Sequence, residues 1–429
     1  MMGNCQVRFL GGRDAVTYAL LPDNKAVRLW RDERDVNQSR ISRLCKELAK
    51  EFPFAKKLNS MARQASGERA WNSISSFYRN CRQGVKKKGY PQFKKHSRSV
   101  EYKTTGWKLS DDRKSINFTD GFKAGKFSLF CNKAVREDLF TLKINRVRVV
   151  RRADGYYAQF CFDGLRSEPG EYTGKVVGLD LGLNYFYKDT NNNAAIYPKY
   201  LRSSEKRIQK LQRRLSRKFV KGVQPQSNNY HKARKRLGKC HLKVQRQRKD
   251  WAVKLARCVV TSNDVVVYED LKIQNMVKNH HLAKSISDAS WYQFTQWLDY
   301  FGKIWGKTVV SVSPHFTSQD CSNCGFRVKK TLLSRTHKCP KCKTEICRDT
   351  NAALNVLKKG MSILGTEFQQ YSGATSCGEP ALEEAHQEST QGHWEAASFE
   401  GKLGETSTSV NEEKSDLISR VDEPRISNS

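Results

Sequence analysis

Four cysteines in two matched pairs carry the most specific chemical signal in the sequence. Cys321 and Cys324 form one Cys-x-x-Cys pair, Cys339 and Cys342 form another, and fourteen residues separate the two pairs. Two pairs at this separation can place four thiolates tetrahedrally around one Zn²⁺ ion, whereas a redox-active pair would explain only one of them. Because four thiolates leave no open coordination position, we expect a structural zinc that stabilises a small ribbon with a thin core.

Three carboxylates form a second candidate site. Asp180 lies inside the apolar run 176–182, Glu269 ends the apolar run 265–268, and Asp349 opens a predicted helix. Carboxylates at strand ends and at a helix start can converge, and together they could bind two Mg²⁺ ions that promote phosphodiester hydrolysis. Taken singly, an Asp at a helix start is more often a cap, and Asp270 could replace Glu269. The pattern alone therefore leaves this site open.

Basic residues crowd two predicted helices, and no acidic residue stands between positions 206 and 249. A solvated helix face is the ordinary interpretation of such a run. The absence of compensating acids favours instead a surface that binds nucleic-acid phosphates. The candidate contacts are Lys206, Arg207, Lys210, Arg213, Arg214, Arg217, Lys235, Arg236, Arg246 and Arg248, and a shorter basic run adds Lys86, Lys87 and Lys88.

The overall composition indicates the same class of partner. The chain of 429 residues has 78 Lys and Arg against 43 Asp and Glu, a net charge of +35. Residues 361–429 carry −9 and residues 1–360 carry +44, so a polyanion is the natural partner of this body. No apolar stretch is long enough to span a membrane, and the N-terminus lacks the apolar core of a signal peptide. Nine of the thirteen cysteines are scattered singly, which argues against a disulfide framework. We expect a cytoplasmic, nucleoid-associated protein.

The elements that must position these residues follow from periodicity. Residues 13–84 have the apolar spacing of helices, and residues 99–172 change to short alternating runs that predict a small antiparallel barrel or sheet. From residue 175 onward, apolar runs alternate with helical segments, which is typical of an α/β domain. Past residue 363 the chain is rich in Gly, Ser, Thr and Glu and has the composition of a disordered acidic tail.

Five motifs stand in the order found in one known family. They are Gly178-Leu-Asp180-Leu-Gly182, Tyr268-Glu269-Asp270-Leu271, Ser287-Asp-Ala-Ser-Trp291, Thr317-Ser-Gln319-x-Cys-Ser-x-Cys-Gly325 and Arg348-Asp349-x-Asn-Ala-Ala353. Together they resemble TnpB, the transposon-encoded OrfB-type family related to the compact type V CRISPR effectors. The resemblance is close from about residue 174 to residue 359 and continues more loosely upstream.

The resemblance implies a RuvC-like nuclease of RNase H fold, with a zinc ribbon inserted before its last helix. TnpB-like proteins bind a guide RNA made from the transposon end and cut target DNA beside a short transposon-adjacent motif. By position, the three carboxylates would be the catalytic acids and Mg²⁺ ligands, and the four cysteines would be the zinc ligands. Gln64 lies roughly where the family's helical region contacts the adjacent motif.

The same resemblance divides the chain into seven segments. They are an incomplete wedge strand (1–12), a helical recognition region (13–84), a β-barrel wedge domain (85–172), the first part of the nuclease (173–314), the zinc ribbon (315–346), the last nuclease helix (347–362) and the disordered acidic tail (363–429). Two features depart from the family. The first wedge strand, rich in basic and aromatic residues in most members, is not recognisable, and the tail lies outside the shared core.

Two other interpretations of the same residues remain open. One is a non-catalytic RNA-guided protein that only occupies its target, against which the three intact carboxylates argue. The other is a zinc-ribbon protein that binds RNA or DNA nonspecifically, without a guide. An older interpretation describes the family as transposases, but no Tyr or Ser recombinase context stands out in this sequence to support it. The sequence leaves the oligomeric state open.

Overall fold

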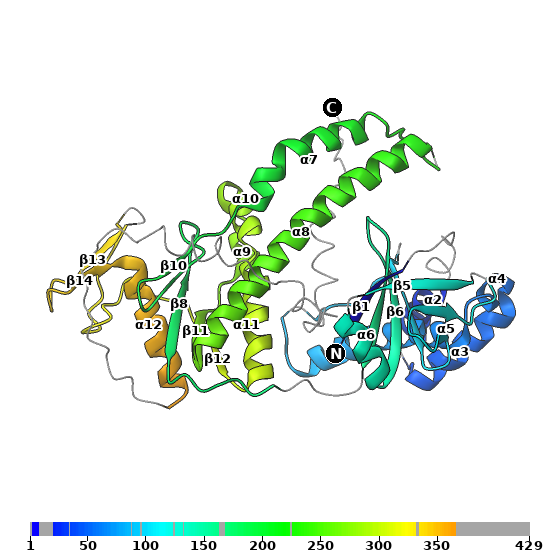
Figure 1. Ribbon diagram of the computed structural model, residues 1–429, viewed down its shortest axis with the longest axis horizontal. Coiled ribbons are helices and arrows are strands. Elements are labelled where there is room, and N and C mark those ends of the chain that lie inside the picture. The colour runs from blue at the N-terminus through cyan, green and yellow to red at the C-terminus, as the bar shows by residue number, and fades with distance from the viewer. Residues whose placement is uncertain are drawn as a thin grey trace. The chain divides into compact units, whose positions relative to one another are not determined.

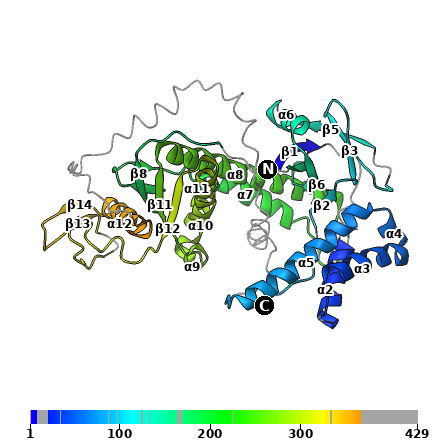
Figure 2. The ribbon, with the colours of Figure 1, turned by 90° about the horizontal axis from the view of Figure 1, so that it is seen from below.

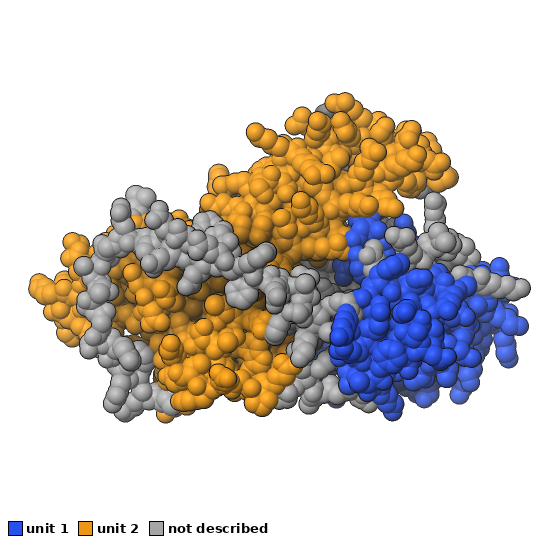
Figure 3. Space-filling model, viewed as in Figure 1, with its two compact units in different colours: residues 1–165, 394–429 blue, residues 166–393 orange. Residues whose placement is uncertain are grey.

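The chain forms two compact units that divide between residues 165 and 166 (Figure 3). In this computed structural model the described residues are 2–7, 20–33, 35–86, 88–94, 97–122, 125–131, 133–162, 168–223, 225–331 and 334–365. The predicted contact Lys87 and nearly all of the predicted tail lie outside them. Among the described residues, no helix has the length and apolar character needed to cross a membrane. The eleven cysteines from Cys45 to Cys347 are free thiols.

Four helices begin the first unit. They are α2 (Leu20–Glu33), α3 (Gln38–Glu51), α4 (Pro53–Lys56) and α5 (Ser60–Arg82). Trp30 is fully buried and packs with Ile41 and Ile74 in the core between these helices. Helix α5 approaches α3 closely at Gly67, where a Cβ atom would lie 2.8 Å from the sulfur of Cys45. A glycine is therefore required at this crossing.

A seven-stranded antiparallel sheet completes the first unit. Its strands are β1 (Met2–Val7), β2 (Ser99–Lys103), β3 (Trp107–Leu109), β4 (Ser115–Phe118), β5 (Lys126–Phe130), β6 (Ile144–Arg151) and β7 (Tyr156–Phe162), in the spatial order β2-β6-β7-β1-β5-β4-β3. Helix α6 (Lys133–Thr141) follows β5. The ring of Tyr102 on the edge strand β2 lies 4.6 Å from the ring of Phe118 on β4. The sheet therefore curves around one apolar core.

Strand β1 corrects the expectation that residues 1–12 lack the first strand. Met2–Val7 pairs with β7 along its whole length, from Met2 opposite Cys161 to Val7 opposite Tyr156, and its last two residues also pair with β5. The sequence Met-Gly-Asn-Cys-Gln-Val contains a glycine and two amide side chains, which are poor strand signals. Backbone pairing on both sides makes this segment a strand, and a local pattern does not record such pairing.

The second unit is built on a five-stranded sheet in the order β10-β9-β8-β11-β12. The strands are β8 (Val176–Leu181), β9 (Tyr187–Asp189), β10 (Ala194–Ala195), β11 (Val265–Glu269) and β12 (Thr308–Val312). Strand β11 is parallel to both β8 and β12, whereas β9 returns antiparallel to β8. The helices are α7 (Tyr200–Ser216), α8 (Asn228–Ser262), α9 (Ile273–Met276), α10 (His280–Ala289), α11 (Trp291–Trp305) and α12 (Arg348–Ile363).

Helices cover both faces of this sheet (Figures 1 and 2). Helix α12 lies so close to β8 that a Cβ atom on Gly178 would stand 2.3 Å from the carbonyl oxygen of Ala353. A Cβ atom on Gly360 of the same helix would contact Val267 of β11. On the opposite face, the hydroxyl of Tyr268 donates to Asp299 of α11 at 3.2 Å. Gly178 and Val267 therefore face α12, whereas Tyr268, the next residue along β11, faces α11.

Two appendages leave this sheet. Helices α7 and α8 lie side by side as a long hairpin (Figure 1), held together by a small apolar core that contains Ile208, Leu237 and Val244. Between β12 and α12 the chain forms a two-stranded ribbon of β13 (Thr336–Lys338) and β14 (Glu345–Cys347). The first cysteine pair precedes this ribbon, and the second pair lies between its two strands. The mixed α/β architecture predicted from residue 175 onward is thus observed.

Candidate functional site

Strand alternation directs two of the predicted acids to the same face of the sheet. Asp180 follows Gly178 by two residues and Glu269 follows Val267 by two, and side chains two residues apart on a strand share a face. Because Gly178 and Val267 both face α12, Asp180 and Glu269 do as well. Leu179 pairs with Tyr268 in the parallel register of β8 and β11. The two acids therefore lie side by side at the carboxyl ends of neighbouring strands.

Asp349 joins them from the first turn of α12. Arg348 Nε and Nη2 each lie 3.0 Å from Asp349 Oδ1, which holds this carboxylate in place. Burial raises the pKa of Asp180 well above its ordinary value, and the negative charges of Glu269 and Asp349 raise it further, while Arg348 opposes the shift. The three acids predicted from the sequence therefore interact electrostatically, although their oxygen atoms do not all lie within 4.8 Å of one another.

Glu269 is the most enclosed member of this group, with 5 % of its surface exposed. Burial raises its pKa to about 7, against the opposing effects of the Thr317 hydroxyl and the Lys359 ammonium group. Clustered carboxylates that resist ionisation accept a divalent cation readily, because the cation relieves their mutual repulsion. The oxygen donors also match the preference of Mg²⁺ for hard ligands. The residues therefore fit the metal that the sequence motifs imply.

The alternative acid Asp270 lies elsewhere. Its side chain is 53 % exposed and forms an ion pair with Lys272, and its amide donates to Val312 of the neighbouring strand. Asp270 directly follows β11, and its carboxylate lies in an exposed environment, unlike that of Glu269. Between the two candidates that the sequence left open, Glu269 is the one at the acidic site.

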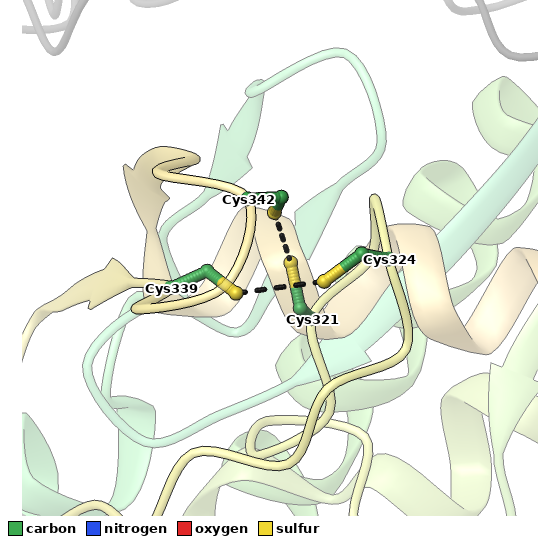
Figure 4. A group of neighbouring side chains, drawn as sticks. All are labelled: Cys321, Cys324, Cys339 and Cys342. Atoms are coloured by element: carbon green, nitrogen blue, oxygen red, sulfur yellow. Dashed lines mark hydrogen bonds between the residues drawn. The ribbon is translucent and has the colours of Figure 1, made fainter.

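The four cysteines form a second, tighter cluster (Figure 4). Sulfur atoms of Cys321 and Cys342 lie 3.6 Å apart, and those of Cys324 and Cys339 lie 3.5 Å apart. In the described part of the chain this is the one group of three or more potential ligands whose donor atoms all lie within 4.8 Å of each other. Four sulfurs at about 2.3 Å from a tetrahedral Zn²⁺ would be about 3.8 Å apart. The cluster therefore fits the predicted zinc site after a small expansion.

Local turns place these sulfurs. Gly325 follows the first pair with φ +75, a conformation that favours glycine, and its amide donates to the Cys321 carbonyl at 2.9 Å. In the second pair the hydroxyl of Thr344 helps to lower the pKa of the Cys342 thiol to about 6. A thiol that ionises this easily is a ready metal ligand.

The basic residues predicted on the hairpin are exposed with one exception. Those on α7 and just after it are Lys206, Arg207, Lys210, Arg213, Arg214 and Arg217, and those on α8 are Lys235, Arg236 and Arg246. They surround the small apolar core that joins the two helices. The hairpin therefore presents positive charge to solvent along much of its length.

Arg248 is the exception and has a structural role. Its Nη2 atom lies 2.8 Å from Asp288 Oδ1, and its side chain is only 15 % exposed. Asp288 also accepts the backbone amides of Leu201 and Arg202 and so satisfies the first turn of α7. Arg248 was predicted to bind phosphate, but this buried ion pair fixes the base of the hairpin to α10 instead.

The remaining predicted contacts belong to the first unit. Gln64 is half-buried on α5, whereas Lys86 and Lys88 are exposed just after that helix. None of them can be related to the acidic site, because they belong to the other unit. Their role in binding remains a sequence-based prediction.

Sequence reasoning missed three side chains that support the hairpin, the acidic site or the cysteine cluster. They are Asp288 at the base of the hairpin, Thr317 beside Glu269 and Asn351 on α12. All three stand in the motifs that carry the family resemblance, at positions to which no role was assigned. Their motif membership was the available signal, but their partners lie 29 to 87 residues away along the chain.

Two known domain families match the chain, almost entirely within this second unit. Residues 159–280 match OrfB_IS605, described as "Probable transposase". Residues 291–356 match the "Cas12f1-like, TNB domain". The first match contains Asp180 and Glu269, and the second contains Asp349 and all four clustered cysteines.

Curated relatives extend the similarity to most of the chain. A protein of Streptomyces pristinaespiralis named "Putative RNA-guided DNA endonuclease" is 28% identical over 351 residues, which cover 80% of this chain and 82% of the relative. Its counterpart InsQ from Escherichia coli K12, with the same description, is 27% identical and covers 69% of this chain and 74% of the relative.

A solved structure shows the same fold. The Cas12f1 chain in a complex with sgRNA and target DNA superposes with a TM-score of 0.51 at 14% identity, covering 80% of this chain and 81% of that chain. The matching domains and the curated relatives together confirm the resemblance to TnpB-like, OrfB-type proteins that the sequence motifs indicated.

Proposed function

We propose that this protein is an RNA-guided DNA endonuclease of transposon origin that cuts target DNA next to a short adjacent motif. The observation that carries the proposal is the convergence of Asp180, Glu269 and Asp349 on one face of the sheet, next to the start of α12. The names of the curated relatives supply the guide and the substrate class. The exposed basic hairpin supplies a surface for the guide or its duplex with the target.

The chemistry follows from the acid cluster. Bound Mg²⁺ would activate water and stabilise the leaving oxygen of a phosphodiester. Asp180, Glu269 and Asp349 would hold the metal, and Arg348 would keep the Asp349 carboxylate oriented. The Zn²⁺ ion that we assign to the four cysteines has no open position for substrate, so its contribution is to stabilise the ribbon.

The test is expression of the full chain together with its native flanking DNA, followed by sequencing of the co-purified RNA. We expect one discrete RNA species from the transposon end, and Mg²⁺-dependent cutting of DNA that matches it. Asp180→Ala should abolish cutting and leave RNA binding intact. Undiminished cutting by this variant would remove the catalytic assignment, and a protein that binds RNA and target but never cuts would be a guided binder. Failure to recover any discrete RNA would refute the guided function.

A further inference from the structure

A network of buried hydrogen bonds connects the cysteine cluster to α12, the helix that carries Asp349. Asn351 is fully buried, accepts the amide of Ser322 at 2.9 Å and donates to the carbonyl of Asp320 at 2.8 Å. These two residues flank Cys321, the first predicted zinc ligand. The position of that cysteine is therefore fixed by a side chain two residues beyond Asp349.

Further residues of the same helix hold the segment that precedes the cysteine. Asn355 donates to the carbonyls of Thr317 and Asp320 at 2.8 and 2.6 Å. Lys359 donates to the carbonyls of Ser313 and His315. Residues 313–322, which run from the end of β12 to the first cysteine pair, are thus held along α12. An amide side chain that is buried with both ends bonded constrains its partners strongly.

Thr317 extends this network to the acidic site. Its hydroxyl donates to Glu269 Oε1 at 2.7 Å, and the carbonyl of Pro314 lies 3.1 Å from the same hydroxyl oxygen. Thr317 is itself buried, with 5 % of its surface exposed. Because one oxygen of Glu269 is engaged in this way, the carboxylate is held in one orientation, with Oε2 left for other ligands.

We propose that Thr317 is a positioning residue that couples the cysteine cluster to the Glu269 carboxylate, so that an ordered zinc ribbon is required for a correctly oriented acidic site. The catalytic consequence of this coupling rests on the proposed function, but the coupling itself can be measured without any cleavage assay. The chain runs from the first cysteine pair, through residues 313–322 held on α12, to the Thr317 hydroxyl and Glu269. Hydrogen-bonded neighbours of metal ligands commonly set metal affinity in this way.

Thr317→Val tests the last step, because it removes the hydroxyl and keeps the shape of the side chain. We expect its affinity for Mn²⁺, measured by calorimetry on the full-length protein, to fall about 10- to 100-fold. We expect guided cleavage to require a correspondingly higher Mg²⁺ concentration. Zinc content and RNA binding should stay at wild-type values, and the melting temperature should fall by only a few degrees, because the buried hydrogen bond that is lost is worth about 1–3 kcal/mol. Thr317→Ser, which restores a hydroxyl, should recover Mn²⁺ affinity to within about threefold.

The matched control is Thr331→Val, in an exposed part of the ribbon. It should behave as wild type in every measurement. Equal Mn²⁺ affinity in Thr317→Val and wild type would overturn the coupling, as would a loss in Thr317→Val that Thr317→Ser fails to restore. A wild-type protein that binds Mn²⁺ but cuts no guided target would refute the proposed function. The Mn²⁺ affinities of Thr317→Val and wild type would still test the coupling in that case. Absence of Mn²⁺ binding in the wild type would overturn both.

The first step is tested by removing zinc with a chelator and following hydrogen exchange. We expect faster exchange at the Ser322 amide and in the first turns of α12, together with weaker Mn²⁺ binding, while the α7–α8 hairpin keeps its protection. Loss of zinc with unchanged exchange in α12 and unchanged Mn²⁺ affinity would show that the ribbon and the acidic site are independent.

Discussion

Replacement of Gly178 by alanine probes the contact on which the geometry of the acidic site depends. The added Cβ atom would lie 2.3 Å from the Ala353 carbonyl oxygen, 2.8 Å from Leu357 Cβ and 2.9 Å from Leu357 N. All three neighbours are backbone or Cβ atoms, so no change of rotamer can relieve the clash. Helix α12 would have to move away from β8, and Asp349 would move with it.

The cost can be estimated from the general behaviour of overpacked cores. Such insertions cost about 1–3 kcal/mol, and a clash with backbone on every side belongs at the upper end. For a unit of roughly 200 residues, ~3 kcal/mol corresponds to a fall in melting temperature of about 6–12 °C. Because the displaced helix carries a metal ligand, cleavage should fall by more than the loss of folded protein explains.

The assay is a thermal melt of the purified full chain combined with guided cleavage at 20 °C, where the variant is still folded. Gly182→Ala, in the same motif, is the control: its Cβ atom would meet only the Tyr185 carbonyl oxygen, at 3.2 Å, so we expect a loss below about 1 kcal/mol. A Gly178→Ala protein that melts within about 1 °C of wild type and cuts normally would show that α12 does not lie against β8 as described.

Two further predictions concern charge. Glu269 has its pKa raised to about 7 from 4.5, so between these pH values the folded metal-free protein binds a proton that the unfolded chain releases. Stability should therefore fall as pH rises from about 4.5 to about 7. Melting temperatures of the metal-free protein should show this slope and Glu269→Gln should reduce it, whereas an equal slope in both proteins would contradict the burial of this group. On the hairpin, Arg213→Gln should weaken guide-RNA binding and reduce the salt dependence of that binding by slightly less than one counterion, without changing the melting temperature. Arg248→Gln should instead lower the melting temperature, because it leaves Asp288 buried without its cation. Fluorescence anisotropy at several salt concentrations and thermal melts distinguish the two variants, and identical effects would refute their different roles.

The sequence predicted those features that depend on short-range spacing. The short alternating runs predicted within residues 99–172 are indeed antiparallel strands, among them 115–118, 126–130 and 156–162. The two cysteine pairs converge because each needs only a local turn. The acids Asp180 and Glu269 were recognised as candidates because an unpaired charge in an apolar run is costly to bury, but the pattern left the site itself, and the choice between Glu269 and Asp270, open.

The features that the sequence did not reveal depend on partners far along the chain. Strand β1 is made by pairing with residues 156–161, more than 140 positions away. Arg248 resembles its exposed neighbours in sequence and differs from them only because Asp288, 40 residues later, lies beside it. In the sequence, nothing distinguishes Thr317 from another threonine that precedes a metal-binding pair. Only the fold, through β11 and α12, brings its hydroxyl to Glu269. Residue type and spacing cannot encode such contacts without the fold.

The most direct test of the acidic site compares two neighbouring carboxylates. Glu269→Gln removes the buried acid that faces α12, and Asp270→Asn removes the exposed acid that pairs with Lys272. The measurement is the rate of guided DNA cleavage in Mg²⁺ at saturating RNA. We predict that Glu269→Gln loses at least about a thousandfold in rate, of the size found when a catalytic group is removed, and that Asp270→Asn stays within about twofold of wild type. Equal rates for the two variants, or a larger loss for Asp270→Asn, would contradict the account.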